Sequence, residues 1–210
     1  MYFQDRYDAA RQLAIQLEKY KGNDGVILAI PRGGVPIGYY LAKHLGFDLD
    51  LLMTKKIGHP ANEEYAIGAV GLEDSIIEDT TNVSDAYLDE MILRIRRQLK
   101  ETYKKFMGRT TPADIRDKIT IVVDDGIATG RTILATLKML RNKQPGKLIV
   151  AVPVASDQAA ERISQEVDEL ICLYIPSRFY GVGKFYLDFN QTQDREVMAL
   201  LKEFAKGHAA

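Results

Sequence analysis

Apolar positions follow two spacings along the chain. Short, nearly continuous apolar runs, each followed by a turn, predict buried strands over residues 26–30, 49–53, 119–123, 147–154 and 169–175. Between these runs the apolar residues recur at helical spacing, which predicts helices over residues 5–20, 34–45, 84–106, 133–140, 156–166 and 193–206. Strands that alternate with helices indicate the α/β class, with a parallel sheet covered by helices on both faces.

Two segments interrupt this alternation. Residues 55–68 form a long polar connection, and we predict a flexible loop there. Two short apolar runs within residues 66–77 predict a hairpin. Ser84 has the residue type that caps a helix start, so the hairpin and the helix after it are predicted to form an insertion over residues 66–107.

Residues 119–132 carry the clearest chemical pattern. A β-branched strand ends in two adjacent carboxylates, Asp124 and Asp125, and a loop with two glycines and two threonines then opens a helix. Free N–H groups at a helix start attract a phosphate, glycine lets that phosphate approach the backbone, and threonine hydroxyls can donate to its oxygens. Paired carboxylates accept hydrogen bonds from the vicinal hydroxyls of a sugar. The pattern favours a phosphorylated sugar as the ligand over an ordinary acidic turn in which Thr129 is only a helix cap.

Two other predicted strand ends carry unusual residues. Residues 31–34 (Pro-Arg-Gly-Gly) combine a bidentate cation with two glycines that can expose backbone N–H groups to phosphate oxygens. Residues 54–56 (Thr-Lys-Lys) begin the polar connection with two further cations. Because ligands bind beyond the carboxyl ends of parallel strands, we expect these two ends to meet Asp124 and Asp125 at one edge of the sheet.

Composition narrows the class of protein. With 210 residues, we expect one domain over residues 1–210, completed by a C-terminal segment over residues 176–210. Lys plus Arg total 28 against 29 for Asp plus Glu, so bulk charge gives no support for a nucleic-acid or membrane partner. The single cysteine, Cys172, is expected to be a buried small apolar residue, and the absence of a cysteine pair or a signal peptide predicts a cytoplasmic protein. No histidine or cysteine spacing typical of a metal site is present.

The segment from Val122 to Thr132 closely resembles the phosphoribosyl pyrophosphate signature of the type I phosphoribosyltransferases. Residues 54–70 are similar to a group of uncharacterised predicted members of that family, so the resemblance covers nearly the whole chain. It implies the parallel-sheet type I fold with a small hood, a homodimer, and residues 55–68 as the catalytic flexible loop. It also implies phosphoribosyl pyrophosphate as donor, a small nitrogenous acceptor, and Mg²⁺ that is held mainly through the substrate.

The resemblance also assigns roles to individual residues. Those implied in holding the 5′-phosphate are Gly126, Ile127, Ala128, Thr129, Gly130, Arg131 and Thr132. Those implied in holding the diphosphate are Arg32, Gly33, Gly34 and Lys55. Those implied in catalysis are Asp124 and Asp125, which would hold the ribose hydroxyls, together with Arg32 and Lys56.

The acceptor is less defined. Purine-salvage members of the family place an acidic residue where this chain has Ala128, so the resemblance argues against a 6-oxopurine and leaves orotate-like, uracil-like or other amine acceptors open. Residues 178–190, rich in glycine and aromatic rings, form either a wall that selects the acceptor or a loop packed by its own rings. His59 is a candidate proton donor, although a loop histidine is more often simply exposed.

We therefore predict a magnesium-dependent phosphoribosyltransferase of nucleotide metabolism. The alternative is a non-catalytic module that senses phosphoribosyl pyrophosphate or a nucleotide, but the cations Arg32, Lys55 and Lys56 favour turnover because they follow strands where leaving charge would develop. A sugar-phosphate hydrolase is less favoured, because adjacent aspartates lack the Asp-x-Asp spacing of aspartyl-phosphate phosphatases.

Overall fold

The computed structural model describes residues 2–208, apart from the side chains of Glu64, Arg131 and His208. Five parallel strands form its central sheet in the order β2-β1-β6-β7-β8. Their bounds are β1 Gly25–Ala29, β2 Asp48–Leu51, β6 Ile119–Val123, β7 Lys147–Val154 and β8 Glu169–Tyr174. The predicted parallel sheet is confirmed, and the switch in strand order lies between β1 and β6, where open α/β sheets bind their ligands.

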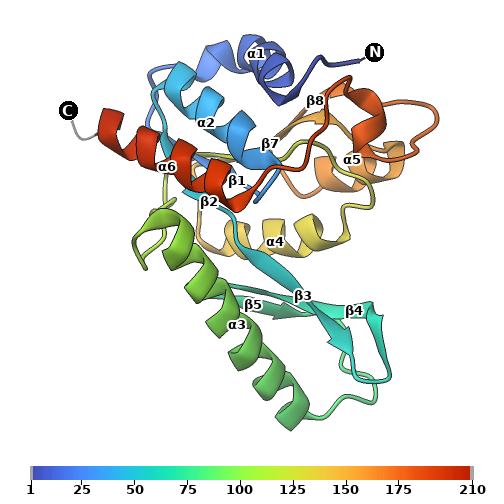
Figure 1. Cartoon of the computed structure of the whole chain (residues 1–210). Coiled ribbons are helices and arrows are strands. Elements are labelled where there is room, and N and C mark those ends of the chain that lie inside the picture. The colour runs from blue at the N-terminus through green and yellow to red at the C-terminus, as the bar shows by residue number, and fades with distance from the viewer. Residues whose placement is uncertain (1, 209–210) are drawn as a thin grey trace.

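Helices cover both faces of this sheet (Figure 1). One face carries α1 (Arg6–Leu17), α2 (Gly34–Leu45) and α6 (Asp194–His208), and the other carries α4 (Arg131–Asn142) and α5 (Asp157–Ser164). Two short 3₁₀ helices, η1 (Glu18–Tyr20) and η2 (Val182–Phe185), lie in the connections. The predicted helices on both faces are therefore confirmed.

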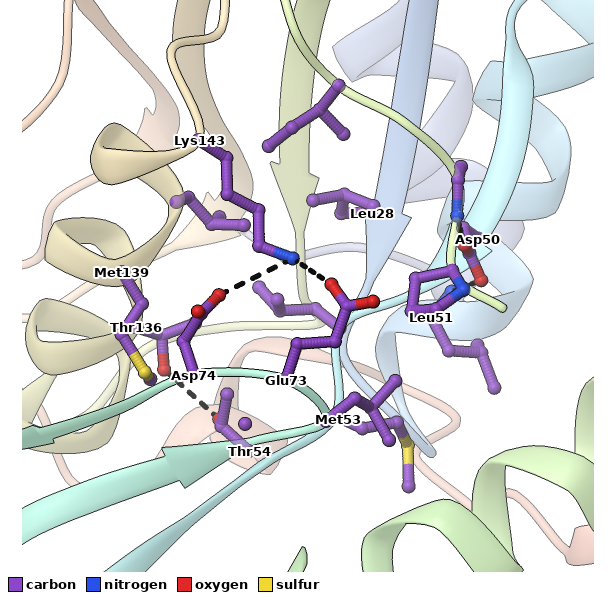
Figure 2. Close-up of a pocket in the computed structure, with 17 residues that line it drawn as sticks. Leu28, Asp50, Leu51, Met53, Thr54, Glu73, Asp74, Thr136, Met139 and Lys143 are labelled. Atoms are coloured by element: carbon purple, nitrogen blue, oxygen red, sulfur yellow. Dashed lines mark hydrogen bonds and ion pairs between the residues drawn. The ribbon is translucent and has the colours of Figure 1, made fainter. Parts of the chain in front are cut away.

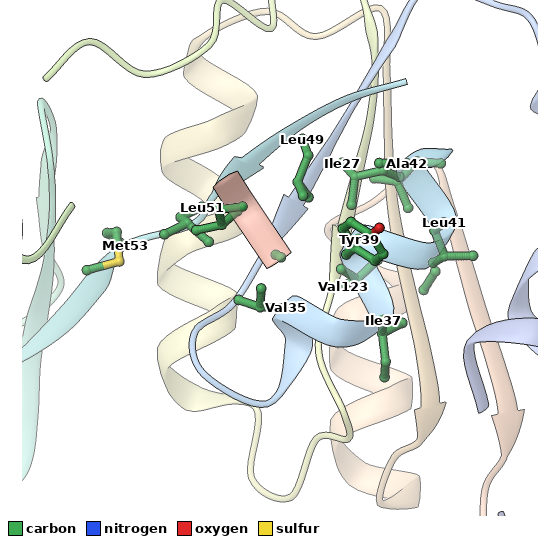
Figure 3. Close-up of a cluster of buried hydrophobic side chains, with 14 of the residues drawn as sticks. Ile27, Val35, Ile37, Tyr39, Leu41, Ala42, Leu49, Leu51, Met53 and Val123 are labelled. Atoms are coloured by element: carbon green, nitrogen blue, oxygen red, sulfur yellow. The ribbon is translucent and has the colours of Figure 1, made fainter. Parts of the chain in front are cut away.

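The core is split between the two faces of the sheet because successive strand residues point in opposite directions. In β1, Ile27 packs with α1, α2 and α6, whereas Val26 and Leu28 pack with α4 and α5. Figure 3 shows part of the first cluster, which includes Val35 and Ile37 of α2 and Ile27 of β1. Because the strands are buried on both faces, the loops at their carboxyl ends start from fixed points.

A second, antiparallel sheet extends from the end of β2. It consists of β3 (Thr54–His59), β4 (Asn62–Gly71) and β5 (Ser75–Ile77), and α3 (Asp85–Met107) packs against it. The predicted hairpin within residues 66–77 is confirmed as β4 and β5, and Ser84 caps α3 by accepting a hydrogen bond from the N–H of Tyr87. Of the α3 stripe, Leu88, Ile95, Leu99, Tyr103 and Phe106 are buried.

The prediction of an irregular loop over residues 55–68 is wrong. These residues form most of β3 and β4, which pair with each other from Thr54 opposite Gly71 to His59 opposite Asn62. The segment is polar because many of its residues are exposed, whereas the apolar side chains of Ile57 and Ile67 are fully buried. Register shifts beside Gly58 further blur the alternation of apolar and polar residues by which a strand is recognised. None of the helices within residues 2–208 combines the length and apolar character needed to span a membrane.

Candidate active site

A cavity of about 320 Å³ opens at the carboxyl ends of β1, β2 and β6. Pro31 follows β1, Thr54 follows the end of β2, and Asp124 follows β6, and all three line the cavity. The rest of the wall comes from the neighbouring residues Ile30, Leu52 and Met53, from the loop between β6 and α4, and from the first two turns of α4. The expected convergence of the three strand ends on one edge of the sheet is thus observed, and the volume suits a small ligand.

The loop from Gly126 to Gly130 is fixed at both ends. Ile127 forms an isolated parallel bridge with Ala155, and the hydroxyl of Ser156 donates to the carbonyl of Ala128 at 2.6 Å. Gly130 then has φ +69°, a left-handed conformation that glycine adopts without strain, and α4 begins at the next residue. The first N–H groups of α4 have no partner within the helix, and Gly130, Thr132 and Ile133 at the helix start line the cavity, as expected of an anion site.

Of the seven residues assigned to phosphate binding, six line the cavity: Gly126, Ile127, Ala128, Thr129, Gly130 and Thr132. The side chain of Arg131 lies outside the described part of the chain.

The two adjacent aspartates point in different directions. Asp124 lines the cavity, and one of its carboxylate oxygens accepts the N–H of Asp125 at 2.8 Å. Burial, together with the neighbouring Asp125 carboxylate, raises the pKa of Asp124 well above its usual value. The Asp125 carboxylate is absent from the cavity lining and instead binds Arg6, whose Nε and Nη2 donate to the same oxygen at 2.9 and 2.8 Å.

The two glycines after β1 allow close packing against this acidic pair. A Cβ atom on Gly33 would lie 1.9 Å from an Asp125 carboxylate oxygen, and one on Gly34 would lie 2.6 Å from the carbonyl oxygen of Val123. The N–H of Gly34 donates to the carbonyl of Ile30 at 3.0 Å, so it is used within the fold and is not exposed as the sequence pattern suggested. Close approach is therefore the structural reason for Gly34 at this position.

Three of the predicted cations lie outside the cavity lining. Arg32 is about half exposed and faces Asp194 at the start of α6, with Nη1 and Oδ1 3.5 Å apart. Lys55 is directed toward α3, where Nζ donates to Gln98 at 3.3 Å. Lys56 borders a separate cavity of about 470 Å³ that shares Thr132 with the first. The loop after Asp125 thus lines the cavity together with Asp124, whereas these three cations do not.

The remaining candidates, His59, residues 178–190 and Cys172, are not among the residues that line the cavity. His59 is the last residue of β3, and its Nδ1 accepts the N–H of Ala61 in the following turn at 3.1 Å. The aromatic rings of residues 178–190 pack on one another, as Tyr186 does on Phe189 with ring centroids 4.9 Å apart, which favours the self-packed loop. The thiol of Cys172 is half-buried, and burial raises its pKa to about 11, which is unlike a reactive cysteine.

Two features of the site escaped the sequence analysis. The first is Arg6, which the helical pattern placed on α1 without a role. The second is a hydroxyl pair, in which Thr136 of α4 donates to Thr54 at 3.0 Å. This pair forms part of the wall between the cavity and a smaller one of about 60 Å³ (Figure 2). A threonine on a buried helical stripe, such as Thr136 beside Ile133 and Leu137, is a sequence signal that could have indicated a polar contact.

The chemistry that the cavity offers is recognition of an anion next to a hydroxylated group. The helix start supplies N–H donors and a positive dipole end, and Asp124 supplies acceptors for hydroxyl groups. Within residues 2–208, no three His, Cys, Asp or Glu side chains come together as candidate metal ligands.

Comparisons with known proteins agree with this chemistry. The profile of the phosphoribosyl transferase domain matches residues 2–190. A Mycobacterium tuberculosis protein, provisionally named a phosphoribosyl transferase, is 36% identical over 217 aligned positions, and that match covers 99% of this chain but 49% of the relative. The chain thus spans about half the length of this relative.

Two further proteins are similar to this chain, one over nearly its whole length and one over a part of it. The crystal structure of TT1426 from Thermus thermophilus has a TM-score of 0.86 and 35% identity, with 97% of this chain and 99% of that chain covered. The bifunctional protein PyrR of Staphylococcus carnosus is 29% identical over 61% of this chain and 75% of its own length.

Proposed function

Because the chain belongs to the phosphoribosyl transferase domain family, we propose that it transfers a phosphoribosyl group from phosphoribosyl pyrophosphate to a nitrogen of a nucleobase-like acceptor. The observation that carries this proposal is the cavity in which the start of α4, the loop before it and Asp124 meet. A phosphate fits the helix start, and a ribose attached to that phosphate would bring its hydroxyls toward the Asp124 carboxylate.

The proposed reaction is a displacement at C1 of the ribose with inversion. The acceptor nitrogen forms a bond to C1 while the bond between C1 and the diphosphate oxygen breaks, and that electron pair leaves with the diphosphate. The nitrogen then loses its proton to water or to a neighbouring base. The contribution of the protein is to hold the phosphate and ribose in position and to stabilise the departing charge.

Leaving charge would be met by cations around the cavity. We propose Arg32 for this role, since it lies beside Gly33 in the loop that packs against the acidic pair. Lys55 and Lys56 are on β3, which starts at the cavity wall, so bending of the hairpin would bring them closer. Mg²⁺, carried by diphosphate oxygens and water, would neutralise charge on the leaving group.

The acceptor is proposed to be something other than a 6-oxopurine. Ala128 offers no acidic side chain, and its carbonyl already accepts the Ser156 hydroxyl. A purine that needs an acid opposite its ring nitrogen would leave that nitrogen unpaired, which strongly disfavours binding.

Calorimetric titration tests the proposal. With Mg²⁺ present, we expect saturable binding of phosphoribosyl pyrophosphate and weaker binding of ribose 5-phosphate and of inorganic diphosphate alone. Release of diphosphate on addition of uracil-like or orotate-like acceptors would then establish turnover. Donor binding without diphosphate release from a broad set of acceptors would favour the sensing module instead, and no donor binding by a folded sample would remove both.

A further inference from the structure

Arg6 is the first residue of α1, and its guanidinium group makes several hydrogen bonds and a ring contact that the sequence pattern did not predict. Asp5 caps the helix by accepting the N–H of Asp8, which fixes the backbone at Arg6. The guanidinium donates twice to one oxygen of Asp125 and once to the carbonyl of Asn190 at 2.8 Å. Its carbon lies 4.1 Å from the centre of the Phe189 ring. The contacts of Arg6 are therefore with the acidic pair and with residues 189–190, which we call the covering segment.

Asp125 is held from several sides as a result. Arg6 binds its carboxylate, the carboxylate lies against Gly33, and the Tyr186 hydroxyl donates to its main-chain carbonyl at 2.6 Å. Its own N–H donates to Asp124. The Arg6 and Asp125 side chains are only 11% and 14% exposed, so this ion pair differs from the largely solvated pairs elsewhere on α1, such as Arg11 with Asp8.

Stability alone is a poor explanation for such a pair. Burying two charges costs several kcal/mol per ion, roughly, before their attraction offsets it, and well-packed apolar residues often serve stability as well. The position of the pair is informative instead, because it joins α1, the covering segment at Phe189, the acidic loop and the loop at Gly33. Two adjacent carboxylates would otherwise compete for the same small volume.

We propose that Arg6 is a positioning residue of the active site, which holds Asp125 turned onto Gly33 so that the Asp124 carboxylate faces the ribose. This inference rests on the proposed function, because it names the residue that sets the geometry of the ribose contact. Arg6 acts through Asp125 and does not itself line the cavity of about 320 Å³ that contains Asp124.

Arg6 also affects the ionisation of the pair. Burial raises the pKa of Asp125, and Arg6 lowers it in opposition. The other titratable groups that face the Asp125 carboxyl are Asp124 and the Tyr186 phenol, whose own pKa is raised by burial and by Asp125. Three more acidic residues share a surface cavity of about 180 Å³ with Arg6, namely Asp5, Asp188 and Glu196. Loss of Arg6 would therefore leave the acidic pair holding a proton at a higher pH.

The test compares Arg6→Gln and Arg6→Lys with the wild type, and uses Arg11→Gln as a control with the same charge change on an exposed position of α1. Ribose 5-phosphate binding is measured by calorimetry from pH 5 to pH 9, alongside thermal melting. For Arg6→Gln we expect affinity to fall, by up to about tenfold for each unit by which the pKa of the acidic pair rises, and to recover as the pH is raised. Arg6→Lys should keep the wild-type pH profile with a smaller loss, and Arg11→Gln should bind like the wild type.

The outcomes separate this inference from the proposed function. Folded wild-type protein that binds neither phosphoribosyl pyrophosphate nor ribose 5-phosphate would remove the proposed function and the inference with it. Wild-type affinity in Arg6→Gln would overturn the inference alone. A loss that is equal at every pH and follows a lowered melting temperature in both Arg6 variants would also overturn it, because it would mark Arg6 as a packing residue.

Discussion

Asp124 is the residue in which the proposed ligand recognition and the stability of the fold oppose each other. Its carboxylate lines the cavity, and burial with the adjacent Asp125 raises its pKa. A raised pKa in the folded state means that the ionised form is penalised there. The penalty is absent at a pH below the usual carboxyl value, grows as the pH rises toward the raised pKa, and is fully present above it.

Asp124→Asn should therefore stabilise the free protein and weaken its binding. The amide keeps an acceptor for the N–H of Asp125 but carries no charge. We expect about 0.5–2 kcal/mol of added stability at pH 7, which shrinks as the pH falls toward 4, together with a marked loss of ribose 5-phosphate affinity. Thermal melts across pH and calorimetry measure the two effects. A variant that is less stable than the wild type at neutral pH would contradict this account of Asp124.

For single residues, the sequence predicted the acidic pair at the end of β6 but did not predict that Arg6 binds Asp125. Asp124 was found because it ends an apolar strand and precedes a glycine-containing loop. Arg6 was not found, because its partner Asp125 lies 119 positions away and an arginine at a helix start is ordinary on an exposed surface. Pairings of this kind depend on how α1 packs, which local pattern does not encode.

Three elements meet at Asp194, the first residue of α6. Its carboxylate binds Lys105 near the end of α3 at 2.7 Å and faces Arg32 of the loop after β1 at 3.5 Å. Asp194 thus competes with diphosphate for the Arg32 guanidinium, which we propose as a diphosphate ligand. We expect Asp194→Asn to tighten diphosphate binding by a few-fold, up to about fivefold, because the competing contact is an exposed and weak one.

Titration of inorganic diphosphate at low and high salt measures this effect, which should be larger at low salt. Asp89→Asn, at an exposed position of α3, makes the same charge change away from the site and should leave affinity nearly unaltered. Weaker binding in Asp194→Asn would mean that Asp194 supports the arginine and does not compete for it.

Elements were predicted best where spacing was regular. The five parallel strands were predicted from continuous apolar runs. The strands β3 and the first half of β4 were not predicted, because apolar and polar residues alternate poorly around Gly58. An antiparallel hairpin pairs its backbone groups whatever its side chains, so polar composition did not exclude strands. The hairpin nevertheless starts at the cavity wall, where the flexible loop was expected.

In the whole molecule, the attachment of the second sheet depends on contacts that the sequence does not reveal. Lys143 at the end of α4 binds Glu73 and Asp74 in the turn between β4 and β5, at 2.5 and 3.4 Å (Figure 2). On the other side, Asp50 of β2 is fully buried and accepts the Tyr103 hydroxyl of α3 at 2.7 Å. Asp50 lies between leucines in a strand, and nothing local identifies a partner 53 positions later.

Tyr103→Phe tests how strongly α3 is tied to the central sheet. Asp50 also accepts the N–H groups of Leu51 and Ala113 and lies 3.2 Å from Arg109, so loss of the phenol leaves a buried charge with one donor fewer. Burial and the Asp50 carboxylate raise the pKa of Tyr103, so the phenol remains a donor at every pH near neutral. We expect the variant to lose about 1–3 kcal/mol of unfolding free energy.

Tyr87→Phe is the matched control, because Tyr87 is on the same helix and donates to a neutral acceptor, the carbonyl of Gly58, at 2.9 Å. It should cost about 0.5–1.5 kcal/mol, since a neutral hydrogen bond is weaker than one to a carboxylate. Thermal or denaturant unfolding compares the two, and hydrogen exchange should show faster opening of α3 in Tyr103→Phe than in Tyr87→Phe. Equal losses would mean that the contacts of α3 with the hairpin, and not the buried carboxylate of β2, hold the second sheet in place beside the cavity.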